Sequence, residues 1–235
     1  MFVPLKVSEV KKLEQTIPWI VVPFRDNAAH ERAEHLRKFA SHIKRYHPDW
    51  HVLIVEQSDD GRKFNRGALL NIGARIAEKS GATYVVFHDV DLLPLAPIVP
   101  YYTVYPQSPI HIGKAWTTKY SHSRFLGGVV SMSIEDMKTT NGFPNQFWGW
   151  GGEDDALRER IFKKEIEIFQ PEMRTGFRDL AHVHVGDDPV HVNLNKRRDV
   201  MNDTGRMGFR TVQWKVLAEE ELTPTIKKIS VELRD

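Results

Sequence analysis

The sequence contains no cysteine among its 235 residues, which excludes a disulfide-stapled scaffold, a thiolate zinc site and a cysteine nucleophile. Net charge is also small, because 33 Lys and Arg residues face 31 Asp and Glu residues. That balance lacks the electrostatic footprint of a protein that binds nucleic acid or an anionic membrane. The sequence shows neither a signal-peptide pattern nor a run of about 20 apolar residues that could span a bilayer. We therefore expect a cytoplasmic chain without a membrane span or a nucleic-acid partner.

The first half of the chain alternates continuous apolar runs with segments of helical periodicity. Strands are expected at 19–24, 51–55 and 83–87. Between them, apolar residues recur every three or four positions over 29–43 and 69–76, which is typical of one helical face. Apolar strands that alternate with helices predict an α/β fold whose mainly parallel sheet is covered on both faces, a Rossmann-like arrangement.

The second half of the chain is less regular. Five prolines and three tyrosines crowd between positions 94 and 109. Beyond them we expect short strands at 127–133, 181–185 and 211–217 and a helix at 153–164. These elements are too few to bury a core of their own. We therefore predict a polar arm at 1–16 and one domain at 17–235, in which a Rossmann-like half (17–92) and an irregular half (93–235) share a mixed sheet.

Two acidic residues follow the third expected strand, and two histidines share one face of a later strand. Asp89 and Asp91 lie where parallel sheets bind their ligands, beyond the carboxyl ends of the strands, and alternation places both on one side. Carboxylates in this arrangement suit a hard divalent cation. His182 and His184 alternate with valines, and imidazoles combined with carboxylates favour Mn²⁺ over Mg²⁺. The alternative interpretations are a solvated turn and a pair of exposed strand histidines.

The segment 147–155, Phe-Trp-Gly-Trp-Gly-Gly-Glu-Asp-Asp, combines aromatic rings, glycines and acids. Flat aromatic faces bind sugar rings, while carboxylates bind sugar hydroxyl groups. Glu153, Asp154 and Asp155 fall in the first turn of the expected helix, where the dipole favours an ionised carboxylate by roughly 0.3–1 kcal/mol. Asp154 heads the inward-facing apolar stripe, whereas Asp155 is rotated away by about 100°. We therefore predict that Asp154 is a general base ionised at neutral pH, with simple capping of the helix as the alternative.

Taken together, these segments resemble the β-1,4-galactosyltransferase family, which consists of inverting, Mn²⁺-dependent enzymes with a GT-A fold. The residues that carry the resemblance are Val22–Arg25, Phe64–Arg66, Leu69–Gly73, Asp89–Asp91, Gly127–Val129 and Trp148–Asp155. The Trp-Gly-Trp-Gly-Gly-Glu-Asp-Asp run is highly specific, and the likeness covers most of the chain. The His-x-His pair is similar to that of the xylose-accepting branch of the family.

The resemblance implies a transfer of galactose from UDP-galactose to the 4-hydroxyl of a sugar acceptor, in one displacement with Asp154 as the base. The implied acceptor is a xyloside or an N-acetylglucosaminide or glucoside. The implied donor-binding residues are Pro23, Phe24, Arg25, Phe64, Arg66, Asp89, Val90, Lys114, Trp150 and Glu153. The implied Mn²⁺ ligands are Asp91, His182 and His184. The implied acceptor-binding residues are Trp150, Gly152, Asp154 and Asp155.

Two further expectations rest on the resemblance. Phe125 occupies a position at which an aromatic ring limits the room for an N-acetyl group on the donor, so galactose is the expected sugar. The basic, glycine-containing stretch 193–210 resembles a second flexible loop of the family that orders when the donor binds.

Other functions remain open at this point. A β-1,4-N-acetylgalactosaminyltransferase would use the same chemistry with a different donor. A carbohydrate-binding protein of the same fold without turnover is a second alternative, but the presence of Asp91, His182, His184 and Asp154 argues against it. A metal-dependent hydrolase is a third, and it leaves the aromatic loop and the uridine-type motifs unexplained.

Overall fold

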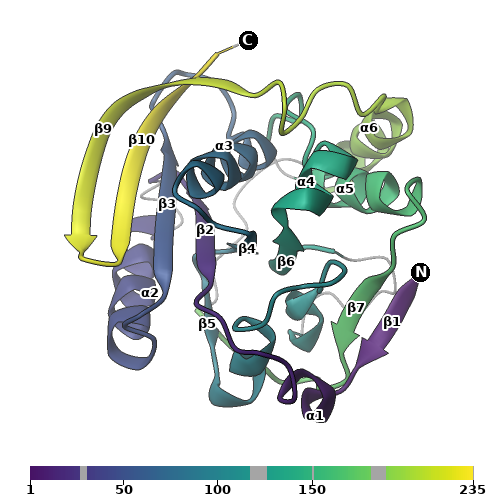
Figure 1. Cartoon of the computed structure of the whole chain (residues 1–235). Coiled ribbons are helices and arrows are strands. Elements are labelled where there is room, and N and C mark those ends of the chain that lie inside the picture. Colours follow the sequence, from purple (N-terminus) through teal and green to yellow (C-terminus); the bar gives the residue numbers. More distant parts are fainter. Residues whose placement is uncertain (27–30, 117–125, 150, 181–188, 235) are drawn as a thin grey trace.

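The computed structural model describes residues 1–26, 31–116, 126–149, 151–180 and 189–234, and for 189–195 it describes the backbone alone (Figure 1). In chain order the elements are β1 (Phe2–Leu5), α1 (Val7–Val10), β2 (Trp19–Phe24), α2 (Arg32–Tyr46), β3 (His51–Gln57), α3 (Arg66–Lys79), β4 (Tyr84–His88), β5 (Leu92–Pro94), the 3₁₀ helices η2 (Ala96–Tyr101) and η3 (Ile112–Ala115), β6 (Val129–Ser133), α4 (Ile134–Thr140), α5 (Glu153–Phe162), β7 (Ile168–Pro171), β8 (Phe177–Asp179), α6 (Pro189–Asn202), β9 (Gln213–Thr223) and β10 (Ile226–Arg234).

A six-stranded mixed sheet forms the centre of the molecule, with the strand order β6-β4-β2-β3-β10-β9. The four inner strands run parallel to one another, and the two edge strands β6 and β9 are antiparallel to their neighbours. Two smaller sheets pair β1 with β7 and β5 with β8. The predicted α/β class with a mainly parallel mixed sheet is therefore confirmed.

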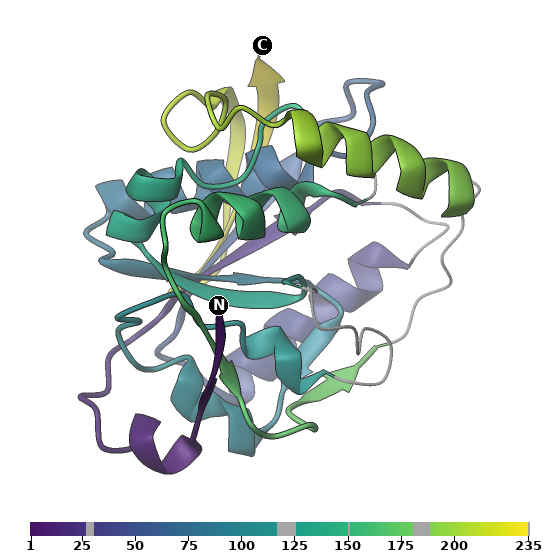
Figure 2. The same ribbon diagram turned by 90° about the vertical axis from the view of Figure 1, so that its right-hand side faces the viewer.

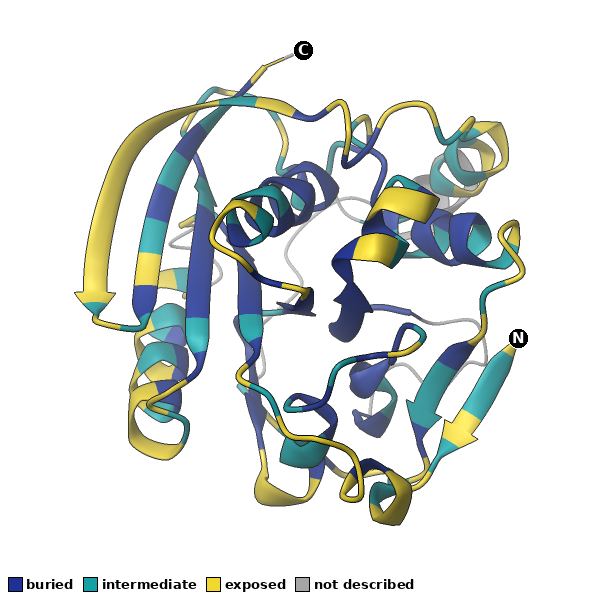
Figure 3. Ribbon diagram, in the orientation of Figure 1, coloured by how far each residue is buried: buried dark blue, intermediate teal, exposed yellow. Residues whose placement is uncertain are grey.

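Helices cover both faces of this sheet, as the alternating pattern predicted. Alternate residues of each inner strand pack into two separate apolar clusters, so that Val21 of β2 faces one side while Ile20 and Val22 face the other. One cluster lies under α3, α4 and α5, and the other lies under α2 together with η2 and η3 (Figure 2). Figure 3 shows the inner strands β2, β3 and β4 and the edge strand β6 as almost wholly buried.

Helix α3 packs unusually closely on the sheet and thereby fixes the position of its first residue, Arg66. The Asn65 side chain caps the helix by accepting a hydrogen bond from the backbone N–H of Ala68 at 3.0 Å. A Cβ atom added to Gly73 would lie 2.2 Å from a methyl carbon of Val21, so only glycine allows this approach of helix and strand. The amino end of α3 is consequently held at the carboxyl ends of β2 and β3.

Some segments differ from the expectations. Residues 1–16, predicted to be an arm, contain β1, which pairs with β7 in parallel, and α1, whose Val10 is fully buried. The stretch 193–210, expected to be a flexible loop that orders when the donor binds, is helical as α6 through Asn202. The strand expected at 211–217 is longer, and it is joined by β10, which inserts between β9 and β3. The strand expected at 181–185 lies outside the described residues.

Within the described residues, no helix combines the length and the hydropathy needed to cross a membrane.

Candidate functional site

The candidate site lies at the carboxyl ends of the parallel strands, where the fold gathers side chains from several elements. Asp89 and Asp91 follow β4, Arg25 follows β2, and Phe64 lies on the connection from β3 to α3. The first turn of α5 supplies the three acids Glu153–Asp155. Open parallel sheets bind ligands at this edge, so the topology places the predicted residues together as expected.

The guanidinium of Arg66 connects the end of β4 with the start of α5. Its Nε and Nη2 donate to one carboxylate oxygen of Asp89 at 3.0 and 2.8 Å. Its Nη1 donates to Asp154 at 2.8 Å and to Glu153 at 3.4 Å. The Arg66 side chain is only 14% exposed, so three carboxylates meet around one largely desolvated cation. Arg66 therefore fixes the distance between the predicted nucleotide-binding and catalytic acids.

Asp91 lies beside this cluster and has a cation of its own. Nη1 of Arg32, the first residue of α2, donates to Asp91 Oδ2 at 3.0 Å. The backbone N–H of Leu180 donates to the Asp91 carbonyl at 2.8 Å, directly after the pairing of β5 with β8. The backbone of residue 180 therefore lies directly beside the backbone of Asp91. Spacing within the sequence gave no indication of the contact with Arg32.

Burial and crowding of negative charge raise the pKa values of Asp154 and Asp89. Burial raises the pKa of Asp154 to about 8, and the charges of Glu153 and Asp89 add to the effect, while Arg66 opposes it. The pKa of Asp89 is raised as well, by burial and by the charge of Asp91. Burial lowers the pKa of Arg66, but the surrounding carboxylates outweigh it and hold that pKa well above its usual range. In the metal-free protein, burial and the neighbouring carboxylates oppose the predicted ionisation of Asp154 more strongly than the helix dipole favours it.

The predicted nucleotide-binding residues divide into a partly exposed pair and a buried support. The guanidinium of Arg25 lies over the Phe64 ring at 5.6 Å from its centroid, and its Nη1 donates to the Arg62 carbonyl at 2.8 Å. Both side chains are half-buried at the edge of the sheet, where a flat ring and a charge are accessible to a ligand. The neighbours Pro23, Phe24 and Val90 are buried. These three residues support the edge from within the core.

Two buried asparagines position the segment that leads to the acids, and their role was not predicted. Asn71 Nδ2 donates to the Phe143 carbonyl at 2.7 Å and to Asn145 Oδ1 at 2.8 Å, while its Oδ1 accepts from the Phe143 N–H at 3.0 Å. Asn65 Nδ2 donates to the Asn145 carbonyl at 2.7 Å. A polar residue inside the apolar run Leu-Leu-Asn-Ile was the available signal, because a buried amide requires partners.

Some predicted site residues are not part of this cluster. Asp155 faces solvent and pairs with Arg158 at 2.5 Å, in agreement with the predicted rotation away from Asp154. Gly152 is the N-cap of α5, with a left-handed φ of 93° that favours glycine. Lys114 lies on η3, and within the described part of the chain it contacts none of the clustered acids. The predicted residues Phe125, Trp150, His182 and His184 lie outside the described residues.

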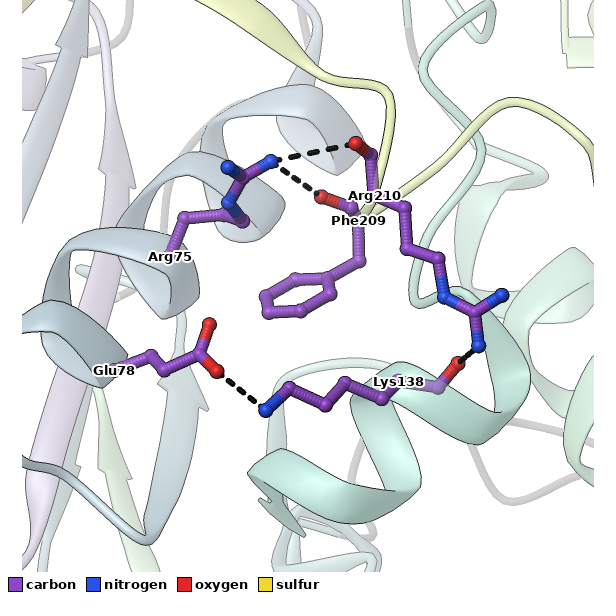
Figure 4. A pocket seen from close by; sticks show the side chains of 5 residues that line it. All are labelled: Arg75, Glu78, Lys138, Phe209 and Arg210. Atoms are coloured by element: carbon purple, nitrogen blue, oxygen red, sulfur yellow. Dashed lines mark hydrogen bonds and ion pairs between the residues drawn. The ribbon is translucent and has the colours of Figure 1, made fainter.

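A cavity of about 350 Å³ opens at the other end of α3 (Figure 4). It is lined by Arg75, Glu78, Lys138, Phe209 and Arg210. Lys138 pairs with Glu78 at 2.6 Å, and Arg75 donates to the carbonyls of Phe209 and Arg210. Nine helical residues, about 13 Å, separate Arg75 from Arg66, so this cavity is distinct from the acidic cluster.

Two family models match the chain and place it among known proteins. Residues 11–103 match the N-terminal region of glycosyl transferase group 7, and residues 108–184 match a galactosyltransferase domain described as N-terminal. Together they cover more than two thirds of the sequence and include every acid of the cluster. The chain belongs to the group 7 glycosyltransferase family.

Curated members of the group 7 family are similar over much of the chain. Xylosylprotein 4-β-galactosyltransferase of Caenorhabditis elegans is 37% identical over 63% of this chain. β-1,4-Galactosyltransferase 7 of Drosophila melanogaster is 38% identical over 86% of it, and that of Homo sapiens is 34% identical over 76%. The chain spans 51–64% of the length of these relatives.

Solved structures of the family agree with the fold. The catalytic domain of Drosophila β-1,4-galactosyltransferase 7 in complex with xylobiose superimposes with a TM-score of 0.74 at 29% identity, covering 94% of this chain and 95% of that one. A mutant of the same enzyme, in complex with manganese, UDP-Gal and xylobiose, gives the same TM-score. The predicted GT-A fold of a group 7 glycosyltransferase is confirmed by this likeness.

Proposed function

We propose that this chain is a Mn²⁺-dependent β-1,4-galactosyltransferase that moves galactose from UDP-galactose to the 4-hydroxyl of a xyloside. The observation that carries the proposal is the contact of Arg66 with both Asp89 and Asp154, which joins the end of β4 to the start of α5. It brings a candidate base within reach of the edge at which a parallel sheet binds a nucleotide. The relatives named for xylosylprotein transfer, and the structure with UDP-Gal and xylobiose, support the choice of donor and acceptor.

The charge of the cluster fits a divalent cation. Asp89, Asp91, Glu153 and Asp154 carry four carboxylates, whereas Arg32 and Arg66 carry two guanidinium groups. Fully ionised, the cluster would therefore hold two uncompensated negative charges in a poorly solvated place. Carboxylate oxygens are suitable ligands for Mn²⁺, which also accepts imidazole.

We propose Asp91 as a direct ligand of Mn²⁺, together with His182 and His184. The described residues contain no cluster of three or more potential ligands, and the proposed set accordingly includes two histidines outside them. Leu180, hydrogen-bonded to the Asp91 backbone, precedes His182 by two residues, and this supports the assignment. When bound, the ion would neutralise the negative charge of the leaving diphosphate.

In the proposed mechanism, the acceptor's 4-oxygen forms a bond to the anomeric carbon of galactose. The bond from that carbon to the diphosphate breaks at the same time, and UDP leaves with the electron pair. In its ionised form, Asp154 accepts the proton of the 4-hydroxyl, and Arg66 holds its carboxylate in position. Attack from the face opposite the leaving group inverts the α-linked donor to a β-linked product.

The proposal is tested with an array of sugar nucleotides and acceptors. UDP-galactose and UDP-N-acetylgalactosamine are each offered with xylosides, N-acetylglucosaminides and glucosides in the presence of Mn²⁺, and the linkage of the product is determined. A β-1,4-galactosyl xyloside is the expected product. A preference for UDP-N-acetylgalactosamine would replace the proposed donor, and the absence of transfer to every acceptor would contradict a transferase function.

A substitution of Asp154 tests its assignment as the general base. Asp154→Asn is expected to lower kcat by about a hundredfold or more, which is the usual contribution of a general base, while UDP binding stays within a few-fold. Glu159→Gln, at a partly exposed position of the same helix, is the matched control and should keep the rate of the parent protein. Similar rates for Asp154→Asn and the parent would remove Asp154 from the mechanism.

A further inference from the structure

The ion pair between Arg32 and Asp91 joins the start of α2 to the acidic edge of the sheet. Nη1 of Arg32 lies 3.0 Å from Asp91 Oδ2, and the two side chains are 24% and 6% exposed. A carboxylate buried to this extent requires a cationic partner, because an isolated charge in poorly solvated surroundings is strongly unfavourable. Within the described part of the chain, Arg32 supplies a cation to Asp91.

The same carboxylate cannot hold two cations without cost. A guanidinium remains charged at every pH at which the protein is folded. A divalent ion bound to Asp91 would lie within a few ångströms of the Arg32 charge, and like charges at that separation disfavour each other. Binding of a metal ion at Asp91 therefore requires that Arg32 moves away or that the ion binds more weakly.

Arg32 is better suited to leave than the other guanidinium in the cluster. Arg66 is 14% exposed and contacts three carboxylates, whereas Arg32 is more exposed and, in the described part of the chain, forms an ion pair with Asp91 alone. Arg32 also lies in the first turn of α2, directly after Glu31, whose left-handed φ of 51° marks an irregular start to the helix. Its side chain can therefore swing away without disturbing the core.

We propose that Arg32 is a placeholder cation, which neutralises Asp91 until a divalent ion replaces it and thereby sets the affinity of the site for that ion. This inference rests on the proposed role of Asp91 as a metal ligand. It assigns to Arg32 a positioning role in the metal-free protein. An ordinary structural ion pair would instead hold Asp91 equally well before and after the ion binds.

The test is a titration of Mn²⁺ alone into the metal-free protein, without nucleotide or acceptor, in which free Mn²⁺ is followed by electron paramagnetic resonance. Removal of the competing charge in Arg32→Gln is expected to lower the Kd for Mn²⁺ about tenfold, since an adjacent like charge commonly shifts an ionic equilibrium by a factor of ten or more. Arg37→Gln is the matched control, because Arg37 lies on the same helix, is largely exposed and pairs with Glu34. It should bind Mn²⁺ as the parent does.

Thermal unfolding gives a second readout that a purely structural ion pair would not produce. Arg32→Gln is expected to be less stable than the parent in EDTA and to recover the difference when Mn²⁺ is added. If this variant does not fold, Arg32→Lys replaces it. An ammonium group should bind Asp91 more weakly than a guanidinium, so the Kd for Mn²⁺ should lie between those expected for the parent and for Arg32→Gln.

The possible failures can be told apart. Equal or weaker Mn²⁺ binding by Arg32→Gln, with clear binding by the parent, would overturn the placeholder role and leave the proposed metal site intact. Binding that persists unchanged in Asp91→Asn, or no binding by any of the proteins, would overturn the metal site itself and this inference with it.

Discussion

The acids around Arg66 show how burial can outweigh a favourable local field. Asp154 lies in the first turn of α5, where the helix dipole stabilises an ionised carboxylate by roughly 0.3–1 kcal/mol. Its pKa of about 8 shows that desolvation, together with the charges of Glu153 and Asp89, contributes more than the dipole and Arg66 do in the opposite direction. At that pKa, the metal-free protein would hold a proton on Asp154 at pH 7.

This proton predicts a pH-dependent stability. The pKa of Asp154 is about 8 in the folded protein and 3.8 in its ordinary state, so the folded state binds a proton that the unfolded chain has lost. The resulting stabilisation is present at acid pH and disappears as the pH rises through 8. Between pH 7 and pH 9 the free energy of unfolding should fall by about 1.4 kcal/mol on account of this residue. The measurement is urea unfolding in EDTA at both pH values.

Asp154→Asn serves as the reference for that measurement. The amide resembles the protonated carboxyl but does not titrate, so the variant should lack this part of the pH dependence. Parallel losses of stability in the parent and in Asp154→Asn would show that the carboxylate is already ionised at pH 7.

At the scale of elements, α3 connects most parts of the site. Its first residue, Arg66, binds the acids, its cap Asn65 and its inner residue Asn71 hold the segment that leads to α5, and its far end lines the cavity in Figure 4. The close approach at Gly73 holds the whole helix against β2. A small outward movement of α3 would therefore disturb the site at several points.

Gly73→Ala tests this packing. The added Cβ would lie 2.2 Å from a methyl carbon of Val21, and overpacking of this kind commonly costs 1–3 kcal/mol, more than the roughly 1 kcal/mol that alanine gains as a helix former. We expect a net loss of about 1 kcal/mol in the free energy of unfolding. The Gly73→Ala, Val21→Ala double variant should lose less than the sum of the two single variants. Additive losses would show that the helix relaxes without a clash.

The elements that could be predicted are those with strong periodicity. Apolar runs and helical spacing identified β2, β3, β4, α2 and α3, because each buries a face along its whole length. The strand β1 and the helix α6 were missed. β1 has four residues, too few to show a period, and α6 lies in a basic stretch whose composition resembled a loop. Ile229, Val231 and Leu233 of β10 do alternate, so that strand could have been found.

The candidate site was predictable only in part, for a related reason. Asp89, Asp91 and Asp154 could be assigned because strand ends and the first turn of a helix have defined places in an α/β fold. The contact of Arg32 with Asp91 depends on how α2 packs against the end of β4, and spacing along the chain does not encode it. The protonation of Asp154 likewise depends on charges that come from three different elements.

For the whole molecule, the hairpin of β9 and β10 lies beyond the two segments that match the family models, yet it completes the central sheet. β10 pairs with β3 in parallel and buries Ile226, Ile229, Val231 and Leu233, whereas β9 is exposed over most of its length (Figure 3). The central sheet therefore contains two strands that lie outside the segments matched by the family models. One strand of the hairpin contributes to the core, and the other covers the edge of its partner.

A matched pair of leucine variants tests this division. Leu233→Ala, at a position 5% exposed in β10, is expected to lower the free energy of unfolding by 2–5 kcal/mol. Leu217→Ala, at a position 50% exposed in β9, should stay within about 0.5 kcal/mol of the parent. Chemical denaturation of the three proteins measures both. Equal effects would mean that the two strands contribute alike to the core.

The place of β10 also bears on how the chain folds during its synthesis. Ser230 of β10 donates to Glu56 of β3, 174 positions earlier in the chain. β3 therefore leaves the ribosome long before β10 is synthesised. Until then, one edge of this apolar strand has no hydrogen-bonding partner from β10. Parallel pairing over so long a loop is slow to form, because the entropy of closure is lost before the contacts form. A nascent chain of this protein should accordingly depend on chaperones until β10 emerges.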